Sequence, residues 1–257
     1  MTLFEFALIG LILLLLLYYN KKKLRKIIIK NKIPSCCIEK VDQSFEPIEK
    51  DNLKKPKKNS IVNFFCIPES FNVVGMTSDY EAWILSVLSK KCKNIFEFGT
   101  CSGKTTLLFA MNSPDDAKIE SITLDENLAR NLATNQIDNK VAKRNIVNES
   151  KYKKFMFSDT EYENKINIIF KDSSLLDVSS KQKKYDLIFI DGGHTYTCIK
   201  NDTEKSLEMI KENGLILWHD FSIGKRSHKD VFKYLNEISN KYPIKHIENT
   251  SLCYLRK

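Results

Sequence analysis

The chain has 257 residues, a formal net charge of +9 at pH 7 and seven cysteines. The basic balance comes without a basic-aromatic module, so we expect no nucleic-acid partner. No two cysteines form a C-x-x-C pair, which excludes the common zinc and redox motifs and leaves reduced thiols as the expectation.

The first segment of the chain is apolar. Residues 3–19 contain one charge, Glu5, and end in Tyr18 and Tyr19, with basic residues following directly at 21–26. About 17 apolar residues are the short end for crossing a bilayer, and basic flanks stay on the cytoplasmic side. A cleaved signal peptide would carry its positive charges before the apolar core. We therefore predict a single-pass transmembrane anchor over residues 1–20 with a cytoplasmic domain behind it; a buried or interfacial helix is the alternative.

A basic segment follows. Residues 21–60 are rich in lysine, contain Pro34, Pro47 and Pro56, and show no sustained periodicity. This composition predicts a mostly extended basic linker, whose simplest partner is a surface of anionic lipid headgroups. The remaining residues, 61–257, are enough for one domain with a sizeable core.

The most informative stretch covers residues 94–106. An apolar run that contains Glu97 leads through Gly99 and Gly103 into a helix-like segment. Glycine at 99 permits a tight turn, and glycine at 103 lets the next helix approach the strand and a ligand. A strand, a glycine turn and a helix in this order are typical of a nucleotide cradle.

Acidic residues recur at the ends of three later apolar runs, at Asp125, Asp172 and Asp191. In a doubly wound α/β sheet the carboxyl ends of the parallel strands form one edge, where the ligand binds. Four such junctions predict this fold, with a cofactor along the carboxyl edge.

The glycine spacing narrows the choice of cofactor. A phosphate-binding loop ending in Gly103-Lys104-Thr105 would need its first glycine at position 98, where the chain has Phe98. The dinucleotide fingerprint fails because Cys101 stands at its second glycine. A nucleotide-phosphate site and a purely structural turn remain as alternatives.

What remains is Glu-x-Gly-x-x-x-Gly, which resembles the first motif of class I S-adenosylmethionine (SAM) methyltransferases. The run Asp191-Gly192-Gly193-His194 resembles the fourth-strand signature of a branch that methylates small molecules or sugars. The resemblance covers about residues 70–257 and departs from the family at Cys101, where glycine is frequent. It implies a Rossmann-like sheet of seven strands, mostly parallel, with the last strand antiparallel.

The resemblance also implies a set of cofactor contacts. Glu97 would serve the aminoacyl end of SAM, Asp125 the ribose hydroxyls, and Asp172 the adenine. Asp125 and Asp172 have structural alternatives as caps of a helix and of a turn. The full set of cofactor-binding candidates is Glu97, Gly99, Thr100, Gly103, Asp125, Asp172, Ser173 and Asp191.

The catalytic candidates lie after the fourth and fifth strands. His194 is the candidate general base, and Asp191 ends an apolar strand, where an unpaired carboxylate would be costly. Asp220 is the third catalytic candidate. Asp191, His219 and Asp220 together would suit a hard divalent cation such as Mg²⁺. We interpret Cys101 as a small filler rather than a nucleophile.

Other segments complete the predicted domain. Ser78-x-x-Glu81 is a capping box, which predicts a helix before the first strand. Residues 126–164 are longer and more polar than a usual crossover and are candidates for a lid. A helix containing Val231 and Leu235 and a hairpin over residues 244–255 should close the chain.

The sequence therefore predicts a membrane-anchored SAM-dependent methyltransferase that O-methylates a hydroxyl of a sugar, a glycan or another small molecule. One rival is a non-catalytic membrane-tethered scaffold, against which the intact acids Glu97, Asp125 and Asp191 argue. The other is a nucleotide-binding, kinase-like enzyme, which the glycine spacing disfavours.

Overall fold

The computed structural model describes residues 8–19, 31–45, 48–49, 52–56, 61–71, 73, 77–132 and 135–257. The chain divides into two compact units, Met1–Lys32 and Ile33–Lys257. Each unit is described by itself.

The described part of the first unit is a helix over residues 8–19 whose leucine side chains are exposed. These residues rise by only about 18 Å as a helix, against about 30 Å of bilayer hydrocarbon. Within the described residues, no helix has the length and apolar character needed to cross a membrane. The prediction of a transmembrane anchor is therefore wrong, and so is the prediction of a single-pass membrane protein that depended on it. Residues 1–7 and 20 of the predicted span and the basic cluster at 21–26 lie outside the described residues.

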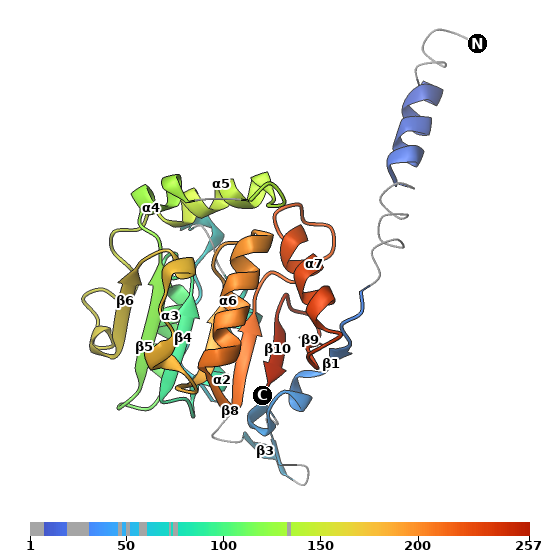
Figure 1. Ribbon diagram of the computed structural model, residues 1–257. Coiled ribbons are helices and arrows are strands. Elements are labelled where there is room, and N and C mark those ends of the chain that lie inside the picture. Colours follow the sequence, from blue (N-terminus) through green and yellow to red (C-terminus); the bar gives the residue numbers. More distant parts are fainter. Residues whose placement is uncertain are drawn as a thin grey trace. The chain divides into compact units, whose positions relative to one another are not determined.

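The second unit is built on a mixed sheet, which has eight strands in the described part of the chain, in the order β1-β9-β10-β8-β7-β4-β5-β6 (Figure 1). Strands β4 to β8 are mutually parallel, and β10 runs antiparallel to β8 and β9. The strands of this sheet are β1 (Ser35–Cys36), β4 (Asn94–Phe98), β5 (Lys118–Thr123), β6 (Ile166–Phe170), β7 (Tyr185–Ile190), β8 (Ile210–Trp218), β9 (Lys245–Ile247) and β10 (Cys253–Arg256). A separate hairpin pairs β2 (Ile48–Glu49) with β3 (Asn52–Pro56).

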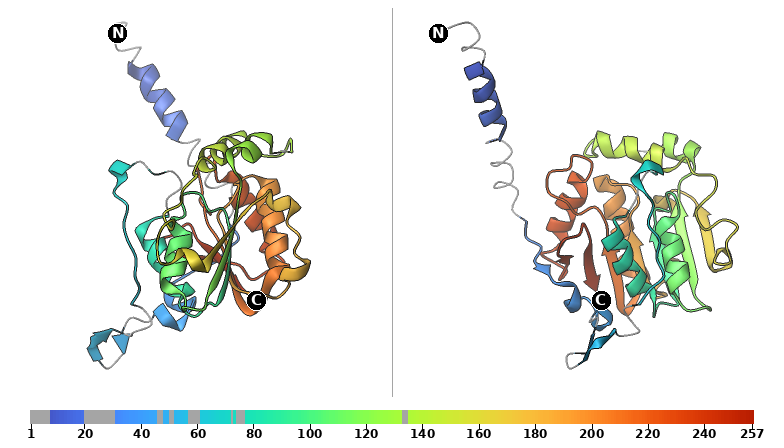
Figure 2. Two further views of the ribbon diagram at one scale, coloured as in Figure 1. Left: turned by 90° about the vertical axis from the view of Figure 1, so that its left-hand side faces the viewer. Right: turned by 180° about the vertical axis from the view of Figure 1, so that it is seen from behind.

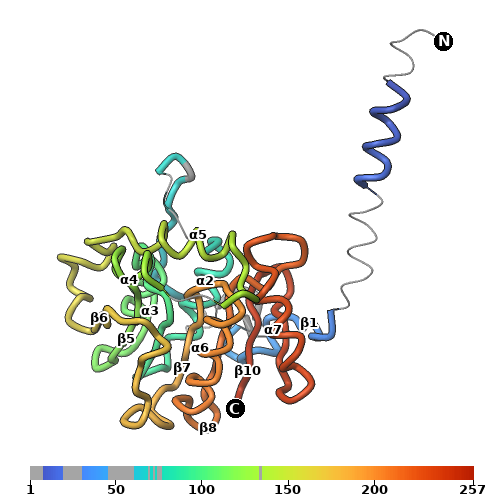
Figure 3. The backbone as a smooth tube through the Cα atoms, turned by 45° about the horizontal axis from the view of Figure 1, so that its top comes forward, coloured from blue at the N-terminus to red at the C-terminus, as the bar shows by residue number. Residues whose placement is uncertain are grey.

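Helices cover both faces of the large sheet, so the predicted doubly wound α/β class is confirmed. Helices α2 and α3 lie on one face, and α6 and α7 lie on the other (Figures 1 and 2). Helix α5 runs across the edge of the sheet (Figure 3). The helices are α2 (Asp79–Ser89), α3 (Lys104–Asn112), α4 (Glu126–Asn131), α5 (Lys140–Glu149), α6 (Tyr196–Met209) and α7 (Lys229–Ile238).

The fully apolar character of β7 follows from this layering. Leu187 and Phe189 pack in the cluster on the α2 and α3 side, and Ile188 and Ile190 pack in the cluster on the α6 and α7 side. A parallel strand covered on both faces has no polar side to show, so its sequence reads as one apolar run.

The predicted local elements are also present. Ser78 and Glu81 form the capping box that begins α2, and the later helix and closing hairpin appear as α7, β9 and β10. These signals depend on contacts between near neighbours in the chain, so the sequence alone reveals them.

The prediction of seven strands is wrong by one, because β1 adds a parallel strand beside β9, with Cys36 opposite Ile247. Strand β1 comes from the segment that was expected to be linker. Within that segment Ile33, Cys36, Val41 and Phe45 are buried, and the Phe45 ring lies 5.4 Å from that of Trp83. These four apolar residues are isolated in the sequence and follow no helix or strand periodicity. Only the tertiary packing therefore shows that they belong to the core.

A fragment that begins at residue 31 should be more stable than one that begins at residue 61. The shorter fragment lacks four buried apolar side chains, each of which contributes on the order of 1.5–3 kcal/mol when fully buried. Urea unfolding of the two fragments measures the difference. The Phe45→Ala variant of the longer fragment is the control and should lose about 3 kcal/mol. Equal midpoints for the two fragments would show that the domain begins later than Ile33.

Candidate functional site

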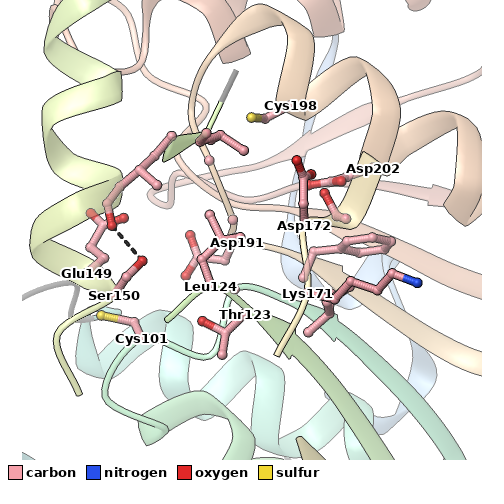
Figure 4. A pocket seen from close by; sticks show the side chains of 18 residues that line it. Cys101, Thr123, Leu124, Glu149, Ser150, Lys171, Asp172, Asp191, Cys198 and Asp202 are labelled. Atoms are coloured by element: carbon pink, nitrogen blue, oxygen red, sulfur yellow. Dashed lines mark hydrogen bonds between the residues drawn. The ribbon is translucent and has the colours of Figure 1, made fainter. Parts of the chain in front are cut away.

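A cleft opens at the carboxyl edge of the parallel strands (Figure 4). Its open volume is about 600 Å³ when counted out to solvent. The lining residues come from the ends of β4 to β7 and from α5 and α6, and the polar ones among them include Thr123, Glu149, Ser150, Lys171, Asp172, Ser173, Asp191 and Asp202. Part of the segment predicted to be a lid therefore lines this cleft.

Glycine at position 99 allows two strand ends to meet. Its φ is +96°, and a Cβ there would lie 2.4 Å from the carbonyl oxygen of Asp191. Gly103 has a φ of +81° and begins α3, where a Cβ would lie 2.9 Å from the Phe157 ring. Both predicted glycines thus shape the turn. Thr100, also a candidate, is buried and shares a hydrogen bond of 2.7 Å with Ser121.

The structure places Glu97 beneath the turn rather than among the residues that line the cleft. Its side chain is 1% exposed and accepts hydrogen bonds from the hydroxyls of Ser121, at 2.6 Å, and Thr106. The pKa of Glu97 is raised to about 8, because burial and, to a smaller degree, the charge of Asp191 outweigh the lowering effect of the two hydroxyls. A direct contact between Glu97 and the cofactor stays a prediction.

The burial of Glu97 should make stability depend on pH. The unfolded carboxyl titrates near 4.5 and the folded one near 8. Between these values the unfolded state binds fewer protons, so the contribution of Glu97 is complete below about pH 4.5 and is lost as the pH rises to 8. Relative to Glu97→Gln, the wild type should lose on the order of 3–4 kcal/mol between pH 5 and 8.

Urea unfolding of both proteins at pH 5 and pH 8 measures this effect. The exposed Glu212 is the matched control, because Glu212→Gln makes the same chemical change without burial and should leave the pH dependence of the wild type intact. Parallel curves for the wild type and Glu97→Gln would mean that Glu97 stays ionised in the fold.

Asp125 and Asp172, which were predicted to contact the ribose and the adenine of the cofactor, also cap a helix and a turn. The exposed Asp125 accepts the backbone N–H of Leu128 at 2.8 Å and thereby begins α4. Asp172 accepts the backbone N–H of Ser174 at 2.8 Å while also lining the cleft beside Ser173. The structural alternatives are therefore correct for both acids, and their contacts with ribose and adenine stay predictions.

The residues predicted after β7 and β8 come together. His194 Nε2 lies 2.8 Å from Asp220 Oδ2, and His219 Nδ1 lies 2.9 Å from Asp191 Oδ1. One donor atom from each of Asp191, His219 and Asp220 lies within 4.8 Å of the others, a set that could hold a divalent cation. Asp191 also lines the cleft, so this cluster adjoins the predicted cofactor site.

Opposed charges dominate this cluster. Burial by itself would lower the pKa of His194, but Asp191 and Asp220 raise it well above its usual range. Burial by itself would raise the pKa of Asp220, but His194 and His219 lower it below its usual range. A histidine must be neutral to accept a proton, so His194 could act as a base only once its carboxylate partners are engaged elsewhere.

Sequence reasoning missed two members of the cluster. His228 Nδ1 lies 3.3 Å from Asp220 Oδ1, and Glu81 Oε2 lies 3.4 Å from His219 Nε2. Glu81 was recognised only as a cap of α2. Its role beside His219 joins residues 138 positions apart, and no local pattern reports such a contact.

Cys101 behaves as the predicted filler. Burial raises the pKa of its thiol to about 12, with a smaller contribution from Glu149, so the reactive thiolate is scarce at neutral pH. All seven cysteines lie among the described residues, and none of them forms a disulfide there.

Comparisons with known proteins agree with this geometry. A family model described as a methyltransferase domain matches residues 96–221. A search of curated proteins found no significant match.

Two solved structures share the fold. A provisionally named caffeoyl-CoA O-methyltransferase from Staphylococcus aureus has 18% identity and a TM-score of 0.51, over 74% of this chain and 88% of its own. A provisionally named O-methyltransferase from Klebsiella pneumoniae has 14% identity and a TM-score of 0.50, over 91% and 97%.

The matched residues begin within β4, before the glycine turn, and end just after Asp220. They therefore contain the turn, the strand ends that form the cleft, and most of the acid–histidine cluster. This cluster consists of Glu81, Asp191, His194, His219, Asp220 and His228. The kinase-like and non-catalytic alternatives have no comparable support. Residues 96–221 match the methyltransferase domain model, and the protein is a SAM-dependent methyltransferase.

Proposed function

We propose that this protein transfers the methyl group of SAM to a hydroxyl oxygen of a small, uncharged acceptor such as a sugar or a glycan unit. The observation that carries the proposal is the double position of Asp191, which lines the cleft and also contacts His219 in the acid–histidine cluster. Groups that can hold or move a proton thus adjoin the cleft that we assign to SAM.

The chemistry needs little beyond positioning and proton removal. The hydroxyl attacks the sulfonium methyl in line, and a site that holds both reactants close contributes several kcal/mol to lowering the barrier. The proton goes to His194 or is lost from a hydroxyl whose pKa is lowered. Asp191, His219 and Asp220 have the donors to hold Mg²⁺, which when bound would supply that lowering.

The charge of the cluster guides the choice of acceptor. Asp191 and Asp220 lie at the methyl-transfer end of the proposed site, and Glu81 and Glu149 add two further carboxyl groups to these surroundings. Such an environment repels a polyanion and tolerates an uncharged polyol, because burying one more negative charge among carboxylates is costly. The name of the Staphylococcus aureus relative refers to caffeoyl-CoA, whose phosphates would meet this repulsion here.

Binding and turnover assays test the proposal. The full chain should bind SAM and S-adenosylhomocysteine (SAH) in calorimetry, and should not bind ATP or NAD. With methyl-labelled SAM, a panel of sugars, nucleotide sugars, catechols, amines and thiols should yield label on oxygen, which mass spectrometry of the product can locate. Label found only on nitrogen or sulfur would contradict O-methylation, and binding of ATP in place of SAM would contradict the cofactor.

A further inference from the structure

Glu149 places a carboxyl group in the cleft. It is the last residue of α5, its side chain is only partly exposed, and it lines the cleft. Among the described residues no hydrogen bond or ion pair joins it to another side chain. Figure 4 shows it beside Ser150 and Cys101, on the side of the cleft where the glycine turn lies.

The charges around Glu149 are mostly unfavourable. Burial raises its pKa most, the charge of His194 lowers it, and the charges of Asp191 and Asp220 raise it by smaller amounts. A partly desolvated carboxylate that faces two others is costly unless a cation joins them. A cationic group of a ligand placed beside Glu149 would offset this cost.

SAM carries two positive charges, on its sulfonium and on its α-ammonium. The α-ammonium has three N–H donors, which a carboxylate can accept, and such charge-assisted bonds are about twice as strong as neutral ones. The other group at this end of SAM is a carboxylate, which suits the N-terminus of α3 just after Gly103. The aminoacyl end then lies at the glycine turn, next to Cys101.

Glu149 is the acid that faces this position. Figure 4 shows Glu149 beside Cys101, which belongs to the turn, and the charge of Glu149 contributes to the raised pKa of the Cys101 thiol. Glu97, the acid that the sequence suggested for the aminoacyl end, is not among the residues that line the cleft, and its Oε2 accepts hydrogen bonds from Ser121 and Thr106. The cation-binding set Asp191, His219 and Asp220 does not include Glu149.

We propose that Glu149 receives the α-ammonium of SAM, and that the cofactor thereby holds the C-terminal end of α5 over the cleft. The other end of this helix is already tied, because the backbone N–H of Asn139 donates to Asp230 at 2.9 Å and Asp138 accepts the backbone N–H of Thr197 at 2.9 Å. The proposal rests on SAM being the cofactor. Glu149 is a positioning residue in it, since it touches the cofactor but not the reacting methyl group.

Two ligands that differ at the aminoacyl end separate this role from a purely structural one. SAH carries the α-ammonium, whereas 5′-methylthioadenosine keeps the nucleoside and the sulfur without any aminoacyl group. In calorimetry on the full chain with a chelator present, Glu149→Gln should weaken SAH binding on the order of 10–100-fold. The affinity of Glu149→Gln for 5′-methylthioadenosine should change by less than about twofold. In the control variant Glu204→Gln, which alters an exposed glutamate, the affinities for SAH and for 5′-methylthioadenosine should both change by less than about twofold.

A second measurement needs no variant. The wild type should bind the desamino analogue of SAH at least tenfold more weakly than SAH itself. Equal affinity for these two ligands, or an equal loss of SAH and 5′-methylthioadenosine in Glu149→Gln, would overturn the proposal. So would unchanged SAH binding in Glu149→Gln. A wild-type protein that binds none of the three ligands would instead contradict the proposed function itself.

Discussion

The Asp220→Ala variant should turn over about 10²–10⁴-fold more slowly than the wild type, with an affinity for SAH that stays within about threefold. Asp220 is the centre of the acid–histidine cluster, since its carboxylate lies 2.8 Å from His194, 3.4 Å from His219 and 3.3 Å from His228. Its removal takes a ligand from the candidate cation set and a partner from the candidate base. Because Asp220 does not line the cleft, cofactor binding should persist.

Chelation decides which of the two mechanisms the loss reflects. If a divalent cation provides the proton chemistry, a chelator should abolish activity in the wild type, Mg²⁺ should restore it, and Asp220→Ala should resemble the chelated enzyme. If His194 is the base, His194→Ala should slow turnover to a similar degree while the chelator has little effect. The exposed Asp177 supplies the control, and Asp177→Asn should retain full activity. Full activity in both Asp220→Ala and His194→Ala, and in chelator, would leave positioning alone as the mechanism.

The Gly99→Ala variant should lose at least about 3 kcal/mol of folding stability together with measurable SAH binding. The new Cβ would lie 2.4 Å from the carbonyl oxygen of Asp191 and 2.7 Å from the Cα of Gly192. Both contacts are with backbone, which cannot rotate away, so the carboxyl ends of β4 and β7 would have to separate. The cleft lies between these ends, and the cofactor site should therefore open with them.

Gly224 provides a matched control for the backbone conformation. It has a φ of +100°, similar to the +96° of Gly99, but a Cβ there would meet nothing within 4 Å. Gly224→Ala should therefore lose only the conformational cost of about 1–3 kcal/mol, with SAH binding unchanged. Urea unfolding and calorimetry on both variants give the comparison. Equal losses at the two positions would show that the close approach of β4 and β7 is not what requires glycine at 99.

The sequence was sufficient for those parts of the fold whose signals are local. The apolar run of β7 marks a buried parallel strand because helices on both faces leave it no polar side. The turn at Gly99 and Gly103 is visible because only glycine tolerates the close approach and positive φ found there. The capping box of α2 is equally local. These features were enough to predict the α/β class, the family and the edge of the sheet that bears the site.

The identity of several site residues could not be read in the same way. Glu97 stands in the expected motif, but whether its side chain faces a ligand or two hydroxyls depends on Ser121 and Thr106. Glu81 and His228 join the cluster through the packing of α2 and of the segment before α7 against the ends of β7 and β8. The contact between Glu81 and His219 joins residues 138 positions apart, and residue spacing carries no information about it.

The N-terminal region shows the same division. An apolar run followed by lysines predicted a membrane anchor from composition, whereas the described helix over residues 8–19 is too short for that purpose. For the lysine-rich segment that follows, the composition predicted a linker, whereas the structure has strand β1 and the buried Phe45 there. Hydrophobic patterning along the chain determined where strands and turns form, because burial and backbone conformation act on neighbouring residues. Which apolar residues enter the core, and which acids face the cleft, was decided by tertiary packing, because only the folded chain brings distant segments together.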